Sequence, residues 1–134
     1  MTTGIGMDGS CTGAFHDVRT KRDVNAVVYR LNSALDGITV ESQGNVTHEE
    51  LVAALPVDQP RIVLYELAYA TSDGTRRNEL VMVSWVPEAC DPAAARAYAQ
   101  ARSVLRTAFD GPGSSLLALT PQDMEHGRLV AQVE

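Results

Sequence analysis

Two apolar segments joined by a short polar one constrain the fold of this chain more than any other feature of its sequence. The segments are RIVLYELAYAT, at 61–71, and NELVMVSWV, at 78–86, and the polar run between them is SDGTRR, at 72–77. Strands that are buried on both faces of a sheet have such near-continuous apolar sequences, whereas half-exposed strands alternate. The two segments therefore predict a long antiparallel hairpin at the centre of a β-sheet.

The part of the chain before this hairpin predicts a helix and a second, shorter hairpin. Residues 8–22 place apolar side chains at spacings of three and four, which is typical of a helix with one face on the core. Residues 26–32 and 38–43 have strand composition and are expected to pair. The Asp36-Gly37 turn between them favours type I′ geometry, because glycine accepts the positive φ that this turn requires.

Capping signals predict three further helices. Each begins with a residue whose side chain satisfies backbone amides at a helix start, and in two of them proline follows, since its missing amide would be unpaired there. The caps are Thr47, with Glu50 completing a capping box, Asp91 and Thr120; the helices are expected over 47–55, over 91–111 and after 120, with a short strand at 115–119.

Length and composition indicate one globular domain. The chain has 134 residues, of which 45% are apolar and 21% are charged. Its formal net charge of −6 argues against wholesale binding to nucleic acid or anionic lipid, which requires a clustered positive field. No apolar run approaches the roughly 20 residues that cross a bilayer, and no secretory signal is evident. We therefore expect a cytosolic protein in which Cys11 and Cys90 are free thiols.

Three motif-like patterns carry little functional weight. GIGMDG, with Gly4, Gly6 and Gly9, matches G-x-G-x-x-G, but the phosphate-binding version follows a strand and opens a helix, and no strand is expected before it. The histidines are scattered, with no pair spaced to bind one metal, and are expected on the surface. No carboxylate pair lies in an apolar stretch, and no serine has an evident base partner. We therefore expect no enzyme, no cofactor and no metal. The histidines are His16, His48 and His126.

The helix expected over 91–111 has an outer face richer in alanine and arginine than a structural helix needs. At about 100° per residue, one broad arc should face the sheet and a neighbouring arc should be exposed. The first arc holds Ala94, Ala97, Tyr98, Ala101, Val104, Leu105, Ala108 and Phe109, and the second holds Ala95, Ala99, Arg102 and Arg106, with Arg96 further round. Small residues admit a partner backbone and arginines bind its carboxylates, but helix propensity and solubility explain the same residues equally well.

Seven segments resemble, in order and spacing, the actin-depolymerising factor/cofilin family. They are TGIGM, VYRLN, LVAALP, PRIVLYELAY, DGTRRNELVMVSWVPE, YAQARSVLRTAFDG and LLALT, and they span nearly the whole chain. The Trp-x-Pro-acidic turn and the Tyr-Ala opening of the long helix are the specific parts. The resemblance implies a single ADF-homology domain over residues 1–134, of α/β class in its α+β form, with a mixed five-stranded sheet flanked by helices on both faces. It implies no enzymatic chemistry and actin as the partner.

The resemblance also implies which residues contact an actin monomer. Thr3, Gly4 and Ile5 look like the family's amino-terminal arm, whose first position is phosphorylated in many members, so Thr3 is a candidate phosphorylation site. The long helix is expected to complete this surface. Ala93 and Ala95 stand where the family usually has two basic residues, which is a departure from the pattern. The expected helix contacts are Arg96, Ala99, Arg102 and Arg106.

Weak binding to the sides of filaments is expected from a second departure. Family members that grip and sever filaments resemble each other in basic residues at the turn between the central strands and on the last helix. Here Arg76 and Arg77 keep the turn, but the last helix offers only Arg128, with Ala131 and Gln132 where charge is typical. Monomer binding should therefore be retained and severing should be poor.

The sequence thus predicts a monomeric, cytoplasmic and cytoskeletal protein that binds actin monomers, prefers their ADP form as the family does, and promotes filament depolymerisation. Phosphoinositide lipids are a further expected partner, bound through Arg19, Lys21 and Arg22 with the helix arginines. Two alternatives stay open. Some relatives of this fold bind the actin-related branching complex or filaments alone. A small nucleotide-binding or hydrolytic domain built on Gly4 to Gly9 would instead show nucleotide-induced thermal stabilisation.

Overall fold

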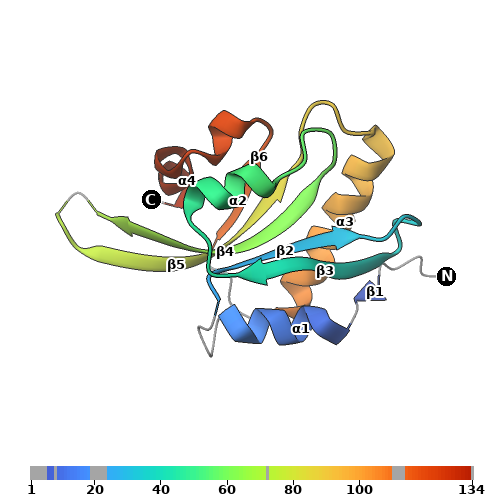
Figure 1. Ribbon diagram of the computed structural model, residues 1–134, viewed down its shortest axis with the longest axis horizontal. Coiled ribbons are helices and arrows are strands. Elements are labelled where there is room, and N and C mark those ends of the chain that lie inside the picture. Colours follow the sequence, from blue (N-terminus) through green and yellow to red (C-terminus); the bar gives the residue numbers. More distant parts are fainter. Residues whose placement is uncertain (1–5, 8, 19–23, 72, 110–113, 134) are drawn as a thin grey trace.

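A single twisted, mixed β-sheet forms the centre of the computed structural model, which describes residues 6–7, 9–18, 24–71, 73–109 and 114–133 (Figure 1). The sheet has six strands in the order β1-β3-β2-β4-β5-β6, one more than expected. The additional strand is β1, which pairs in parallel with the start of β3. The strands are β1 (Gly6–Met7), β2 (Ala26–Leu31), β3 (Gly37–Gly44), β4 (Arg61–Ala70), β5 (Arg76–Trp85) and β6 (Ser114–Ala118).

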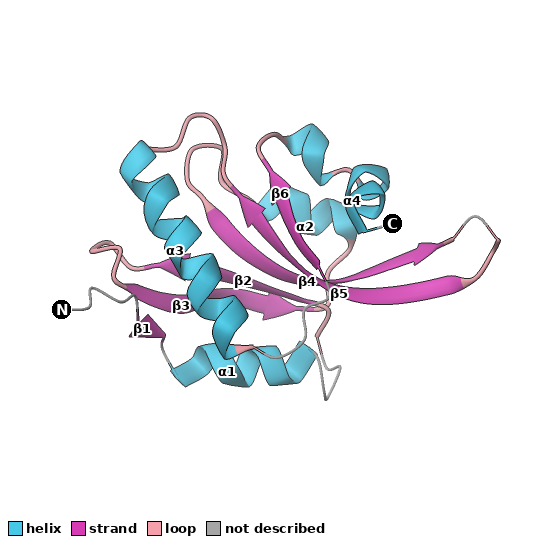
Figure 2. Ribbon diagram, turned by 180° about the vertical axis from the view of Figure 1, so that it is seen from behind, coloured by secondary structure: helices cyan, strands magenta, loops and turns pink. Residues whose placement is uncertain are grey.

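Helices cover both faces of this sheet, as the resemblance implies (Figure 2). Helices α1 and α3 lie on one face, and α2 and α4 lie on the other. Each pair closes its own apolar cluster, with Leu64 and Met82 in the first and Leu67 and Trp85 in the second. The sheet is therefore buried on both sides at its centre. The described helices are α1 (Gly9–His16), α2 (His48–Ala54), α3 (Pro92–Ala108) and α4 (His126–Val133), and the short 3-10 helix η2 (Pro121–Met124) precedes α4.

The predicted central hairpin is confirmed and is longer than expected. Strands β4 and β5 pair antiparallel along their whole lengths, and their far ends project from the body of the molecule (Figures 1 and 2). Arg76 lies opposite Ala70 and Arg77 lies opposite Tyr69. The two arginines therefore belong to a strand, and the expectation that they form part of the turn is wrong, because the ladder continues past Asn78.

A carboxylate organises the turn at the tip of this hairpin. The Asp73 side chain accepts hydrogen bonds from the Thr71 hydroxyl and from the Thr75 amide, the latter at 3.0 Å. These bonds favour the charged form and lower the pKa of Asp73 to about 2, with the Thr71 hydroxyl the largest contributor. Gly74 has a φ of 88°, a conformation that residues with a Cβ rarely adopt.

The turn between β2 and β3 differs from the predicted type I′ Asp36-Gly37 turn. The positive φ, at 61°, belongs to Leu35, and Gly37 is already part of β3. A Cβ on Gly37 would lie 2.8 Å from Nδ2 of Asn32, so a larger residue there would displace the Asn32 side chain. The Asn32 side chain holds the turn by donating to Oδ1 of Asp36 at 2.9 Å and accepting from the Asp36 amide at 3.1 Å.

Helix α3 begins as predicted and ends earlier. Asp91 accepts a hydrogen bond from an amide of the first turn, and Pro92 is the first helical residue. The helix ends at Ala108, ahead of Gly111, which lies outside the described residues. Ala108 was predicted to face the core but is exposed. Phe109 fills that end of the core instead, because its ring stacks on Phe15 with ring centroids 4.3 Å apart. On the rest of that face, Tyr98, Ala101, Leu105 and Phe109 are buried and Ala94, Ala97 and Val104 are half-buried.

Helix α1 is described over a shorter range than the predicted 8–22. Its α-helical part ends at His16 and a π-helical turn follows over 17–18, while Asp8 and residues 19–22 lie outside the described residues. Cys11 is fully buried, and its thiol donates to the Ile38 carbonyl at 3.4 Å. Cys11 and Cys90 are both free thiols, as expected.

The predicted cap at Thr47 is confirmed, and the one at Thr120 starts a different element. Thr47 accepts from the Glu50 amide at 3.1 Å while the Glu50 carboxylate accepts from the Thr47 amide at 2.8 Å. Thr120 and Asp123 form the same reciprocal pair, but it begins η2 and not α4. The final helix is therefore interrupted at Glu125. None of the helices in the described ranges is long and apolar enough to cross a bilayer.

Candidate functional site

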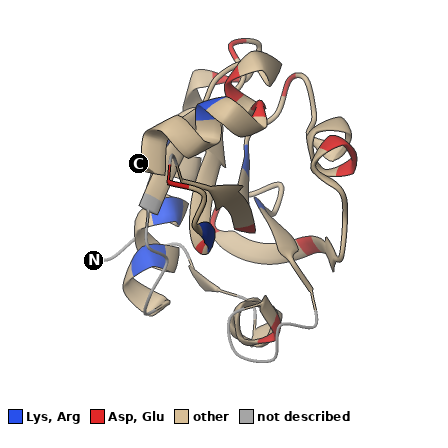
Figure 3. Ribbon diagram, turned by 90° about the vertical axis from the view of Figure 1, so that its left-hand side faces the viewer, with Lys and Arg blue, Asp and Glu red and all other residues tan. Residues whose placement is uncertain are grey.

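The exposed side of α3 carries positive charge without any compensating acid on the same helix. Its 17 residues include three arginines and no aspartate or glutamate. Arg96 and Arg106 are exposed, in a chain whose formal net charge is −6. Helix α2, on the opposite face of the sheet, carries Glu49 and Glu50 in its first turn (Figure 3). The fold therefore separates a basic surface on α3 from acidic residues on the other side of the molecule.

Arg102, the third arginine of α3, was predicted to be exposed, and the structure corrects this prediction. Arg102 is half-buried, because its Nη1 donates to the hydroxyl of Ser115, in β6, at 3.3 Å. Ala95 and Ala99 lie on the same side of the helix as Arg102, Ala95 half-buried and Ala99 exposed. The structure thus brings Ala99 and Arg102 together beside β6, with the exposed Arg96 and Arg106 elsewhere on the same helix.

One buried polar contact joins α3 to the sheet, and a buried ion pair lies beside the start of the helix. The Tyr98 hydroxyl accepts a hydrogen bond from the Leu31 amide, in β2, at 2.9 Å. Near the start of the helix, the buried Arg61 pairs with Glu41 at 3.0 Å and donates to the Pro60 carbonyl at 2.7 Å. A buried cation without these partners would be strongly unfavourable. The Tyr98 hydrogen bond therefore fastens α3 to β2, and the ion pair compensates the buried charge of Arg61.

Several expected site residues lie outside the described residues, and the structure is silent on them. They include the amino-terminal arm, with its candidate phosphorylation site, and the basic segment expected to bind phosphoinositides. The described chain begins at Gly6, whose amide donates to the Asp36 carbonyl at 3.0 Å. The residues outside the description are Thr3, Gly4, Ile5, Arg19, Lys21 and Arg22.

The G-x-G-x-x-G pattern does not belong to a dinucleotide-binding unit. The short strand β1 begins at Gly6, so it lies within the pattern and not before it, and Gly9 begins α1. The strand that follows α1 is β2, which is antiparallel to β3, the strand that β1 joins in parallel. A dinucleotide-binding unit requires a parallel βαβ crossover at this point. The glycines are therefore in a different topology.

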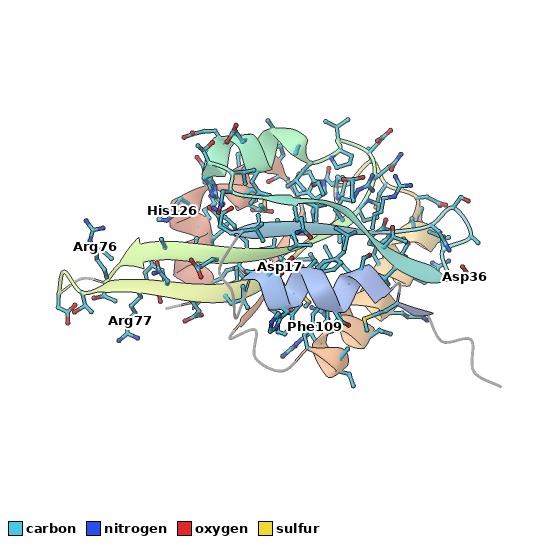
Figure 4. All side chains as sticks on the ribbon, turned by 60° about the horizontal axis from the view of Figure 1, so that its bottom comes forward. Asp17, Asp36, Arg76, Arg77, Phe109 and His126 are labelled. Atoms are coloured by element: carbon cyan, nitrogen blue, oxygen red, sulfur yellow. The ribbon has the colours of Figure 1, made fainter. Side chains whose placement is uncertain are left out.

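The residues expected to bind filaments do not form one continuous basic patch. Arg76 and Arg77 are neighbours in β5 and point to opposite sides of the hairpin (Figure 4). Arg128, in α4, pairs with Glu125 at 3.4 Å and approaches Asp123 at 3.8 Å. A partner that contacts one of the two hairpin arginines therefore does not contact the other from the same side. The positive charge of Arg128 is offset by its acidic neighbours.

His48 and His126, distant in the sequence, meet between α2 and α4, which the sequence did not predict. His16 and His126 are exposed, as expected, and His48 is half-buried. The rings of His48 and His126 lie edge to face, with centroids 5.9 Å apart. Nε2 of His48 lies 2.6 Å from the Met124 carbonyl, and Nδ1 lies 3.4 Å from the Tyr65 hydroxyl. Nε2 of His126 lies 2.7 Å from the Ala68 carbonyl. Because the carbonyls accept, the facing ring nitrogens donate, and the pair fastens η2 and α4 to the sheet.

Burial also changes the acidity of tyrosines around these contacts. It raises the pKa of Tyr65 above its usual value. Burial, and to a lesser extent the nearby Cys11 thiol, raises the pKa of Tyr29, whose hydroxyl donates to the Cys11 carbonyl at 3.1 Å. Both phenols therefore stay protonated and serve as structural hydrogen-bond donors. Within the described ranges, no three His, Cys, Asp or Glu side chains are grouped so as to hold a metal ion.

A mixed sheet with a core on each face and a basic helix exposed along one side defines an α+β domain with a surface suited to macromolecular binding. Residues 4–134 match the family described as cofilin/tropomyosin-type actin-binding protein. The chain belongs to that family, as the resemblance of its seven segments indicates, and the family's members are actin-binding regulators rather than enzymes.

Relatives and solved structures agree with this membership. The chain is 30% identical to actin-depolymerizing factor 9 of Arabidopsis thaliana over 125 residues, which covers 92% of this chain and 89% of the relative. It is 27% identical to the cofilin of Ogataea parapolymorpha, covering 85% and 81% of the two chains. The crystal structure of Streptomyces griseoflavus cofilin has the same fold, with a TM-score of 0.89 at 23% identity over 98% of both chains.

Proposed function

We propose that this protein binds actin monomers and promotes the depolymerisation of actin filaments. Family membership supports actin as the partner, and the names of relatives such as actin-depolymerizing factor 9 support depolymerisation as the outcome. The observation that carries the proposal is the acid-free face of α3, with Arg96, Ala99, Arg102 and Arg106. Arginines supply forked donors for carboxylates on a partner, and the small Ala99 lets a partner backbone approach the helix.

The amino-terminal arm is proposed to complete this surface. Thr3, Gly4 and Ile5 precede β1, which enters the fold at the edge of the sheet next to β3. A phosphate on Thr3 would add negative charge to an arm that must dock beside a partner already bound by arginines, and would weaken docking. Thr3→Glu should therefore lower the affinity for actin monomers, whereas Thr3→Ser should preserve it. Equal affinities for the two variants would exclude this switch.

Monomer binding is proposed to favour ADP-actin, as the family resemblance implies. Binding to the sides of filaments is proposed to be weak, with poor severing. The support is the separation of Arg76 from Arg77 across the hairpin and the pairing of Arg128 with acidic neighbours. A partner that requires several basic residues on one face meets fewer of them here. The protein is proposed to act as a monomer in the cytoplasm, associated with the cytoskeleton.

Co-sedimentation with filaments and a monomer titration on the same preparation test this proposal. Monomer binding is expected, tighter with ADP-actin, together with little protein in the filament pellet. Arg106→Ala and Arg102→Ala should each weaken monomer binding about two- to fivefold, the effect of removing one partly solvated charge pair. Arg30→Ala, which removes an arginine from β2, is the matched control and should bind like the original chain. Binding to neither form of actin would refute the proposal.

Phosphoinositide binding is a further proposal, through Arg19, Lys21 and Arg22 together with the arginines of α3. A local basic segment can bind anionic headgroups even when the net charge is negative. Liposome sedimentation tests this directly. Greater pelleting with phosphoinositide-containing vesicles than with neutral ones is expected, and equal pelleting would contradict it.

A further inference from the structure

A pocket of about 180 Å³ opens between α3 and the ends of strands β5 and β6. Ala95 and Ala99 form part of its wall on the helix side, and Val86 and Leu117 line it from the sheet side. The two alanines leave this space because they lack the side-chain volume to reach the sheet. At about 30 Å³ per water molecule, the volume corresponds to about six waters, or to one compact organic molecule of about ten non-hydrogen atoms.

An unsatisfied buried hydroxyl lies at this pocket. Ser84, in β5, lines it and is 8% exposed, and its Oγ has no hydrogen-bond partner among the described residues. Buried hydroxyls in native proteins nearly always have a partner, because burying an unpaired polar atom is unfavourable. The Oγ atom itself has almost no accessible surface, so Ser84 contributes to the wall of the pocket and its hydroxyl does not face a bound molecule directly.

The charges that line the pocket are positive. Arg61 and Arg102 contribute to its lining, and no acidic residue from the described part of the chain does. Glu41 neutralises Arg61 at 3.0 Å but does not line the pocket. Arg102 forms no ion pair with any residue in the described ranges, and its hydrogen bond there is to the Ser115 hydroxyl, at 3.3 Å. The Arg102 guanidinium therefore retains donors for an anion.

The remaining lining is apolar and partly open to solvent. Leu117 is one of the large apolar side chains that stay exposed, at 49%, and it forms the rim together with Ala99. We propose that this pocket binds a compact organic carboxylate, with its apolar body between Ala99 and Leu117 and its carboxylate on Arg102. The mixture of an apolar wall and a few convergent polar groups is typical of small-molecule sites.

A titration of the full chain with phenylacetate, followed by amide NMR, tests the proposal without actin. Saturable shifts are expected at Ser84, Ala99 and Leu117, with a dissociation constant on the order of 1 mM for a ligand of this size. Phenylacetamide has nearly the same shape and no charge, and should bind at least fivefold more weakly. Linear, non-saturating shifts or equal binding of the two compounds would overturn the proposal.

Substitutions that fill the pocket, or that remove the positive charge from its lining, provide a second test. Ala99→Leu should abolish phenylacetate binding, whereas Gln100→Leu, which adds a leucine to the same turn on a residue outside the pocket lining, should leave it unchanged. Arg102→Gln should weaken binding at least fivefold. If Ala99→Leu does not fold, Arg102→Gln still decides the result. Unchanged binding in Arg102→Gln would overturn the assigned role of the guanidinium.

Such a ligand would also regulate partner binding, a step that rests on the proposed function. Ala99 and Arg102 belong to both the pocket and the proposed actin surface, so saturating phenylacetate should lower the affinity for actin monomers at least threefold. Unchanged actin affinity alongside NMR-detected binding would overturn the regulatory step. Failure of the chain to bind actin would refute the proposed function, while the NMR titration would still decide whether the pocket is a site.

Discussion

Most buried polar side chains described above have a hydrogen-bond partner within the fold, and Ser84 is an exception. Its hydroxyl is buried in β5 and unpaired among the described residues. Ser84→Ala should therefore leave the free energy of unfolding unchanged or raise it by up to about 1 kcal/mol in ligand-free buffer. Urea denaturation measures this, with Ser103→Ala on the exposed side of α3 as the control. A loss of about 1 kcal/mol would show that a water molecule in the pocket satisfies the hydroxyl.

His48 represents the opposite case, because both of its ring nitrogens have partners. Replacing it with alanine would leave the Met124 carbonyl and the Tyr65 hydroxyl without this contact. His48→Ala should lower the free energy of unfolding by about 2 kcal/mol. His16→Ala, at the exposed end of α1, should change it by less than about 0.5 kcal/mol. Similar effects of the two substitutions in urea denaturation would contradict the structural role of His48.

At the scale of elements, the tip of the β4–β5 hairpin depends on the charge of Asp73. Its pKa of about 2 lies below the value of about 3.9 expected in the unfolded chain. The carboxylate therefore stabilises the tip above about pH 4, and that contribution is lost as the pH falls from about 4 towards 2. A carboxyl-carbon NMR titration should give a midpoint near 2, and Thr71→Val should raise it. A midpoint near 4 in the original chain would contradict the hydrogen bonds at the tip.

The same hairpin separates two arginines that look equivalent in the sequence. Arg76 and Arg77 point to opposite sides of the ladder, so a filament that docks on one face contacts one of them (Figure 4). Of the variants Arg76→Ala and Arg77→Ala, one should reduce the fraction that pellets with actin filaments at least twofold and the other should not. Each variant is the control for the other. Equal losses would mean that the filament contacts both faces of the hairpin.

Elements whose signals are local could be predicted, and those that depend on distant partners could not. The caps at Thr47 and Asp91 follow from side chains that bond amides within the next three residues, so the sequence is sufficient for them. The turn before β3 looked like a glycine turn, yet Leu35 takes the positive φ, because Asn32 and Asp36 hold the loop in a different geometry. The extension of β5 to Arg76 was missed because it depends on pairing with β4.

For the whole molecule, the sheet and its two covered faces were predictable from the apolar pattern and the family resemblance, whereas the contacts between layers were not. β1 is two residues long and exists because β3 offers a free edge, which no local pattern reveals. His48 and His126 meet because α2 and α4 lie on the same face of the sheet. The basic residues of the candidate site were identified from the sequence, but the pocket beside Arg102 required the placement of β6 against α3.

The distribution of charge over the whole molecule leads to a final prediction. The chain is acidic overall, yet α3 carries arginines without acids, so the contribution that we propose for it in actin binding is local and should be screened by salt. Raising the ionic strength from 0.05 to 0.2 M should weaken monomer binding about fivefold, because the Debye length falls below about 8 Å. In the double variant Arg96→Gln/Arg106→Gln, which keeps Arg102, this dependence should be clearly reduced but not lost. If the affinity of this variant for actin monomers fell with ionic strength as steeply as that of the original chain, the small side chains of α3, and not these two arginines, would account for binding.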